Sequence, residues 1–89
     1  MKNRYAKEVR FGDSALYERL DGKYELFVQD DSPIENNPIT EESISAAYQQ
    51  LLRLCPLEDI AKVPPELFDE LRPLMQPKML AGLMQRKLA

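Results

Sequence analysis

Hydrophobic and polar residues alternate with a period of two across the first third of the chain, and this alternation predicts β-strands. Asp21-Gly22 separates two such runs, Ala15–Leu20 and Lys23–Gln29. An Asp-Gly pair in this setting predicts a hairpin, because a tight turn needs the positive φ that glycine tolerates. A third strand over Tyr5–Phe11 turns at Gly12-Asp13. The chain is therefore expected to begin with an antiparallel β-meander.

The turns set the register of this meander. A two-residue turn at Gly12-Asp13 sets these pairs opposite each other: Lys7 with Glu18, and Val9 with Leu16. A two-residue turn in the second hairpin sets Glu18 against Glu25, and like charges directly opposite each other are destabilising. A three-residue turn with a bulge at Gly22 avoids this by pairing Arg19 with Lys23. The pattern predicts the hairpin and leaves its register open.

After residue 40 the apolar spacing changes to three and four, which predicts helices. The first predicted helix spans 40–55, with Thr40 as its N-cap, Glu41 and Glu42 in its first turn, and Pro56 as its stop.

Prolines interrupt the rest of the chain. Leu57–Val63 is expected to form a short helical turn, and Pro65 to begin a helix over Glu66–Met75 that Pro73 kinks or ends. Pro77 opens a last helix that runs through Leu88.

The order of these elements predicts an α+β fold, with three to four helices packed on a small antiparallel sheet of two to three strands. The 89 residues are expected to form one domain. Its segments are the meander 1–29, an acidic loop 30–39 rich in proline and asparagine, the helix 40–55 and the helices of 57–89.

Composition excludes most chemistry. The chain has no histidine, one cysteine and three glycines. These numbers leave no histidine base, no zinc ligand set and no glycine-rich phosphate loop. Cys55 falls at a predicted helix C-terminus, where the dipole opposes a thiolate, so it is expected to pack in the core. We therefore expect no enzyme, no metal and no cofactor.

Two further features bear on location. A lone cysteine cannot form an intramolecular disulfide, so we expect a reducing, cytoplasmic setting. No stretch approaches the roughly 18 apolar residues that a bilayer span needs, so no membrane partner is expected.

Two predicted surfaces could bind a protein. The sheet has two faces that both carry large apolar residues, and helices on one side leave the other open, so its aromatic residues are candidate anchors: Tyr17, Tyr24 and Phe27. The last helix has a methionine-rich stripe that suits a groove or a homodimer: Met79, Leu83 and Met84. The leading hypothesis is an adaptor, regulator or inhibitor that docks on a larger protein or complex. Short, acidic, cysteine-poor proteins of this kind include many that are encoded by phages and mobile elements.

Two alternatives stay open. Basic residues alternate with aromatic ones near the N-terminus and could hold nucleic acid: Lys2, Arg4, Lys7 and Arg10. The net charge of −3 opposes a phosphate backbone, so a nucleic-acid-binding regulator ranks second. A structural subunit that assembles with itself ranks third.

Overall fold

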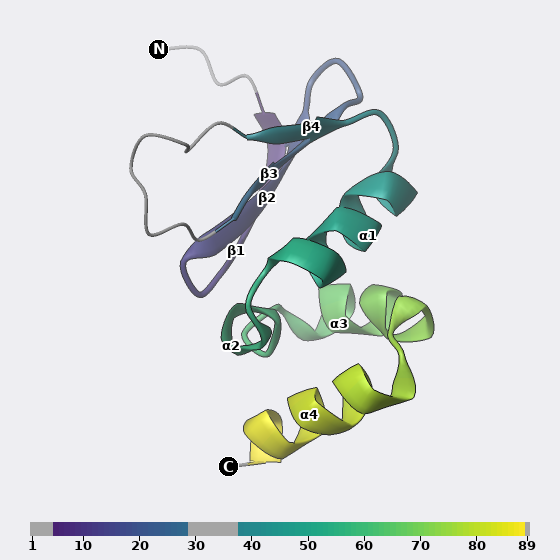
Figure 1. Ribbon diagram of the computed structural model, residues 1–89. Coiled ribbons are helices and arrows are strands. Elements are labelled where there is room, and N and C mark those ends of the chain that lie inside the picture. Colours follow the sequence, from purple (N-terminus) through teal and green to yellow (C-terminus); the bar gives the residue numbers. More distant parts are fainter. Residues whose placement is uncertain (1–4, 29–37, 89) are drawn as a thin grey trace.

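The computed structural model describes residues 5–28 and 38–88, and it shows an antiparallel sheet followed by helices that lie on one side of it (Figure 1). The strands are β1 (Tyr5–Phe11), β2 (Ser14–Arg19), β3 (Tyr24–Phe27) and β4 (Ile39–Glu41), paired in the order β1-β2-β3-β4. The helices are α1 (Ile44–Leu54), α2 (Leu57–Ile60), α3 (Pro65–Leu71) and α4 (Pro77–Leu88), with a 3₁₀ turn, η2 (Arg72–Leu74), after α3. The α+β prediction is confirmed.

The sheet has one strand more than the two to three predicted. β4 pairs antiparallel with β3, and Thr40 lies opposite Glu25 in it. The prediction of Thr40 as a helix N-cap is therefore wrong. Ser43 caps α1 instead, because its side-chain oxygen accepts a hydrogen bond of 3.1 Å from the Ala46 N–H. Residues 39–41 use their backbone hydrogen-bonding groups to pair with β3, so the helix begins at the next residue that can cap it.

Two other parts of that prediction change with β4. Glu41 ends the strand and Glu42 precedes the helix, so neither lies in the first turn of α1. Of the predicted loop 30–39, Ile39 belongs to β4, and residues 30–37 lie outside the described residues. The proline-related boundaries agree with the predictions, since α3 and α4 begin at Pro65 and Pro77.

The first hairpin has the predicted register, with Lys7 opposite Glu18 and Val9 opposite Leu16. The second adopts the three-residue turn. The Arg19 N–H donates to the Lys23 carbonyl at 2.7 Å, and Gly22 supplies the positive φ of 90°. Glu18 faces Tyr24 rather than Glu25, so the like-charge pair does not form.

This register decides which side chains share a face of the sheet. Leu16 lies opposite Leu26, which places both with Val9 and Phe11 on the face that the helices cover. Tyr17 and Phe27 fall on the other face, because a shift of one residue moves a side chain across the sheet.

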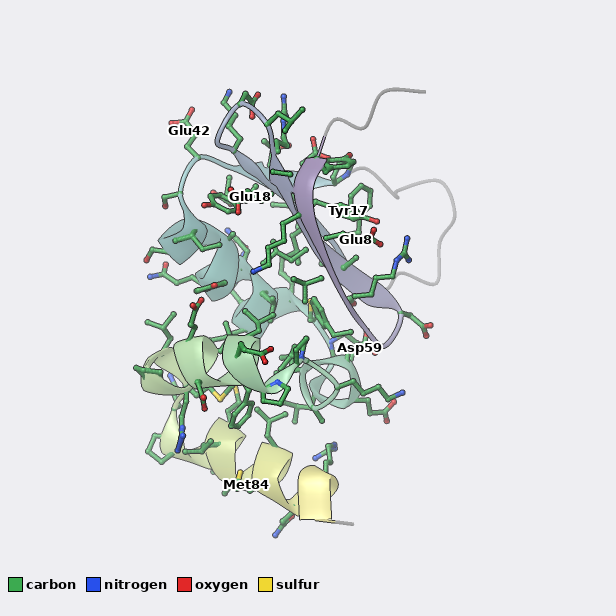
Figure 2. All side chains as sticks on the ribbon, turned by 180° about the vertical axis from the view of Figure 1, so that it is seen from behind. Glu8, Tyr17, Glu18, Glu42, Asp59 and Met84 are labelled. Carbon is green, nitrogen blue, oxygen red and sulfur yellow. The ribbon has the colours of Figure 1, made fainter. Side chains whose placement is uncertain are left out.

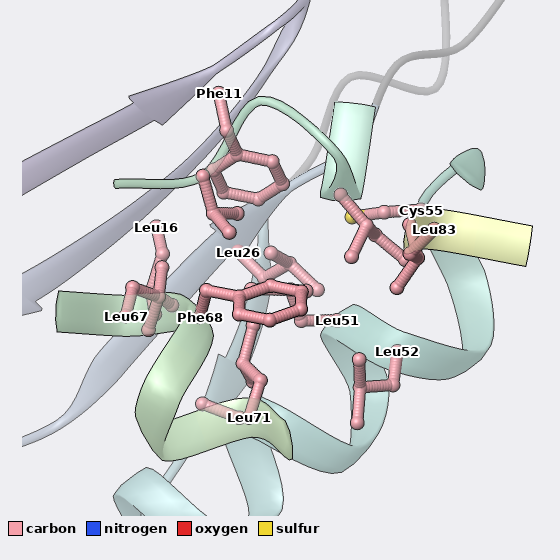
Figure 3. Close-up of a cluster of buried hydrophobic side chains, with 13 residues drawn as sticks. Phe11, Leu16, Leu26, Leu51, Leu52, Cys55, Leu67, Phe68, Leu71 and Leu83 are labelled. Atoms are coloured by element: carbon pink, nitrogen blue, oxygen red, sulfur yellow. The ribbon is translucent and has the colours of Figure 1, made fainter. Parts of the chain in front are cut away.

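The core lies between this covered face and the helices (Figure 3). Phe11, Leu16 and Leu26 come from the sheet, and α1, α3 and α4 add fully buried leucines: Leu51, Leu71 and Leu83. Each such side chain contributes about 1.5–3 kcal/mol by leaving water. α1 packs mainly against β3 and β4, which leaves β1 overhanging at the edge.

A buried carboxylate joins the sheet to the helices. Asp59 of α2 is 3% exposed and lies at the β1–β2 turn (Figure 2). Its Oδ2 accepts a hydrogen bond of 2.7 Å from the Ser14 hydroxyl, and its Oδ1 accepts one of 3.3 Å from the Asp13 N–H. Gly12 makes this approach possible, because a Cβ there would lie 2.1 Å from Oδ1.

The two turn glycines allow a matched test of this junction. Gly12→Ala should lower the free energy of unfolding by more than about 2 kcal/mol, because it adds a clash with Asp59 to the strain of a positive φ. Gly22→Ala carries only the strain, about 1 kcal/mol, since nothing lies within 4 Å of its added Cβ. Urea unfolding followed by circular dichroism measures both, and equal losses would refute the clash.

Candidate functional site

Three aromatic rings lie side by side on the sheet face turned away from the helices, and we call them the aromatic row: Tyr5, Tyr17 and Phe27. They come from β1, β2 and β3. The ring centroids of Tyr5 and Tyr17 are 4.5 Å apart, and those of Tyr17 and Phe27 are 5.3 Å apart in an edge-to-face contact. All three side chains are half-buried, so part of each ring remains accessible. These contacts hold the rings in fixed positions.

Charged groups fix Tyr17, the middle ring of the aromatic row. The Tyr17 hydroxyl donates to Glu8 Oε2 at 3.2 Å and accepts from Arg10 Nη2 at 3.2 Å. Arg10 also forms an ion pair with Glu8. Burial raises the pKa of Tyr17, and the bond to Glu8 raises it further, while Arg10 opposes both. The hydroxyl therefore keeps its proton near neutral pH. Tyr17 and Glu8 lie on one side of β1, with Glu18 on the other (Figure 2).

Tyr5, at one end of the aromatic row, is held by a buried carboxylate. Glu25 is 8% exposed, and it accepts 2.7 Å and 3.2 Å hydrogen bonds from the Tyr5 hydroxyl and Arg19 Nη1. Arg19 Nη2 also contacts Asp21 Oδ2 at 2.7 Å. The pKa of Asp21 is lowered mainly by a hydrogen bond from the Lys23 backbone N–H, and to a smaller extent by Arg19. The rim charges are thus paired within the chain. Glu8, Arg10 and Glu25 orient the two tyrosine rings.

The structure brings Tyr17 and Phe27 together but separates Tyr24 from them. The three-residue turn places Tyr24 on the helix-covered face, where it packs against the core. Sequence reasoning missed Tyr5 as a neighbour of Tyr17. Tyr5 lies on the same face as Tyr17 because a register irregularity between Tyr5 and Lys7 moves it across the sheet. No glycine or proline in that stretch signals the irregularity.

The methionine-rich stripe of α4 divides between core and surface. Leu83 is 0% exposed and belongs to the core, which leaves it no surface to offer a partner. Met79 is partly buried against the same core, and Met84 is 43% exposed. Met84 is the most exposed of the three.

Alanine substitutions distinguish these positions. Leu83→Ala should lower the free energy of unfolding by about 2–5 kcal/mol, because it leaves a cavity in the core. Its neighbour Met84→Ala should change it by no more than about 0.5 kcal/mol, as surface substitutions usually do. Denaturant titration of both variants gives the comparison. A near-neutral Leu83→Ala would show that α4 does not belong to the core.

Of the basic residues proposed for nucleic acid, the two that the structure describes, Lys7 and Arg10, do not share a surface. Lys7 lies on the helix-covered face of β1 and Arg10 on the other, as their alternate positions in the strand require. Arg10 is already paired with Glu8. Lys2 and Arg4 lie outside the described residues.

Cys55 is buried at the end of α1, with 7% of its surface exposed. Burial raises the pKa of its thiol from 9.0 to about 11, the Asp59 carboxylate adds to this, and a hydrogen bond with Ser14 opposes it. A protonated thiol is a poor nucleophile. An unfolded thiol ionises at lower pH than this folded one, so its contribution to stability is complete below pH 9 and is lost as the pH rises to about 11.

Alkylation tests this environment. In the folded protein at pH 8, Cys55 should react with iodoacetamide on the order of 100-fold more slowly than in urea, because the reagent must wait for local opening. The exposed position 45 offers a control, since Ser45→Cys should add one rapidly formed adduct. Intact-mass spectrometry counts the adducts. Equal rates at both cysteines would show that Cys55 is accessible.

Comparison of the chain with protein-family models, with curated proteins and with solved structures finds no match. Within the described residues, no group of three or more histidine, cysteine, aspartate or glutamate side chains could hold a metal ion. No helix in that same part of the chain is long and apolar enough to cross a membrane.

Proposed function

We propose that this protein is a small non-catalytic interaction module, an adaptor, regulator or inhibitor that docks on a larger protein through the aromatic row. The observation that carries the proposal is the continuous contact of Tyr5, Tyr17 and Phe27 across three strands on the face opposite the helices. Aromatic residues dominate the energy of protein interfaces. The buried lone thiol of Cys55 also suits the reducing cytoplasm, where we place the module.

The aromatic row suits docking because it is held in place before any partner arrives. Neighbouring strands lie about 4.8 Å apart, so three rings cover roughly 10 Å, the scale of a compact energetic centre. Hydrogen bonds to Glu8 and Glu25 fix the two tyrosines. Little rotamer entropy is then lost on binding, so more of the contact energy appears as affinity. The paired charges supply a polar rim of the kind that surrounds interface centres.

The test uses the tagged protein as bait in lysate of its native host, read by quantitative mass spectrometry. A stoichiometric protein partner should be captured, and the double variant Tyr17→Thr with Phe27→Thr should capture at least about tenfold less. Threonine keeps the strand propensity, and circular dichroism checks the fold. Leu74→Thr removes a more exposed apolar side chain from η2 and should leave capture unchanged. Full capture by the double variant would contradict the proposal.

Two further readouts separate the alternatives. Loss of every partner after nuclease treatment would favour the nucleic-acid regulator, and its affinity would then fall steeply with salt. A rise in mass with concentration in light scattering would favour the self-assembling subunit. A partner that survives nuclease and binds a monomer supports the docking module.

A further inference from the structure

β1 is an edge strand of the sheet that the structure describes. It pairs with β2 on one side, and on its other side no strand of the described residues lies beside it. β1 has seven residues, whereas the opposite edge, β4, has three and follows Pro38. Short strands and proline block pairing at an edge. Of the two edges, β1 is therefore the one able to accept another strand.

The register identifies the backbone groups that β1 offers. Gly12 has a φ of 62° and Asp13 a negative φ, as in a type II′ turn whose closing pair, Phe11 and Ser14, is hydrogen-bonded. Hydrogen-bonded and non-hydrogen-bonded pairs alternate along an antiparallel ladder. Counting back from the turn, Glu8 and Arg10 direct their N–H and C=O groups away from β2.

A groove of about 610 Å³ runs beneath this edge on the helix side. It forms because α1 packs under β3 and β4, so β1 overhangs and α3 closes the space below. Apolar and aromatic side chains of the sheet and of two helices line it: Val9 of β1, Leu16 of β2, Tyr24 of β3, Ile44 and Tyr48 of α1, and Leu67 of α3. Ile44 is 37% exposed, so the groove presents apolar surface to solvent. A volume of this size can hold one or two side chains of a ligand.

The groove is acidic. Glu18, Glu66 and Glu70 line it, and none of them forms an ion pair with any described cation. Glu70 accepts a hydrogen bond from the Tyr48 hydroxyl, which fixes its carboxylate. Burial raises the pKa of Tyr48, and Glu70 raises it further, so this hydroxyl remains a donor. The lining also includes Lys7 and the ion pair of Arg10 with Glu8. Carboxylates therefore outnumber cations by four to two, so a cationic side chain would complement the groove.

We propose that β1 binds an extended, basic peptide segment of a partner protein by strand addition. Backbone pairing with Glu8 and Arg10 would supply affinity, and alternate side chains of the peptide would enter the groove. One of these would be aliphatic, against Val9 and Leu67. The next, two positions along, would be lysine or arginine, directed at Glu66 and Glu70. The inference does not rest on the aromatic row, because the groove lies on the opposite side of β1.

A second copy of this chain fits the edge less well. Antiparallel pairing about Val9 would set Glu8 opposite Arg10 of the second copy, which is favourable. It would also bring the carboxylates of both grooves together on one side of the joined sheet, and like charges placed so oppose association. The charge of the groove therefore favours a basic peptide.

The experiment titrates the full-length protein with a capped peptide, Ser-Thr-Val-Thr-Arg-Thr-Ser, in which valine and arginine are two positions apart. Amide shifts in NMR spectra give the affinity and the site. The expected result is saturable binding with the largest shifts at Glu8 and Arg10. Replacing the arginine of the peptide by glutamate should weaken binding at least tenfold. N-methylation of the threonine between valine and arginine should abolish it, because that N–H pairs with β1.

Matched variants of the protein test the charge. Glu66→Gln with Glu70→Gln should weaken binding of the arginine peptide at least tenfold, since it removes the groove carboxylates while leaving oxygens that accept hydrogen bonds. Glu42→Gln with Glu58→Gln removes the same charge from exposed positions outside the groove and should leave binding unchanged. Glu42 precedes α1, away from the groove-lining end of β1 (Figure 2).

Four outcomes would overturn the inference. They are no saturable binding, equal binding of the arginine and glutamate peptides, shifts confined to the aromatic row, and protection of the Glu8 and Arg10 amides by self-association without peptide. The last would identify a second copy as the occupant. None of them alters the capture test of the aromatic row, whose variants Tyr17→Thr and Phe27→Thr leave the groove intact.

Discussion

The buried carboxylate of Asp59 is the constraint on which the arrangement of this small protein depends. A carboxylate that is 3% exposed would be costly without hydrogen-bond donors, and Asp13 and Ser14 supply donors from the β1–β2 turn. α2 is thereby fixed to the tip of the first hairpin. Because α1 and α3 flank α2 in the chain, their positions under the sheet follow from the same junction. The shape of the groove beneath β1 depends on it in turn.

Local rules were sufficient for much of the fold. The two glycine turns, the end of α1 before Pro56 and the starts of α3 and α4 at prolines all follow from backbone preferences that act within a few residues. The order of the predicted elements, strands first and then helices, was sufficient to predict the α+β class. The second hairpin adopts the register that avoids opposing Glu18 and Glu25, so pairing energy between side chains settled what the turn alone left open.

Tertiary effects account for what the sequence did not reveal. β4 forms because β3 offers a partner, and that contact overrides the capping preference of Thr40. Tyr5 reaches the aromatic row through an irregularity in β1 that has no residue signature. The groove collects Val9, Tyr48 and Leu67 from three elements far apart in the chain. Such a site exists only after packing, so no motif could have predicted it.

The placement of the tyrosines has a spectroscopic consequence. The chain has four tyrosines and no tryptophan, so its intrinsic fluorescence arises from tyrosine alone. Tyr5 and Tyr17 belong to the aromatic row, while Tyr24 and Tyr48 line the groove beneath β1. Every emitting ring therefore borders one of the two surfaces, and the unlabelled protein carries its own optical reporter for occupation of either.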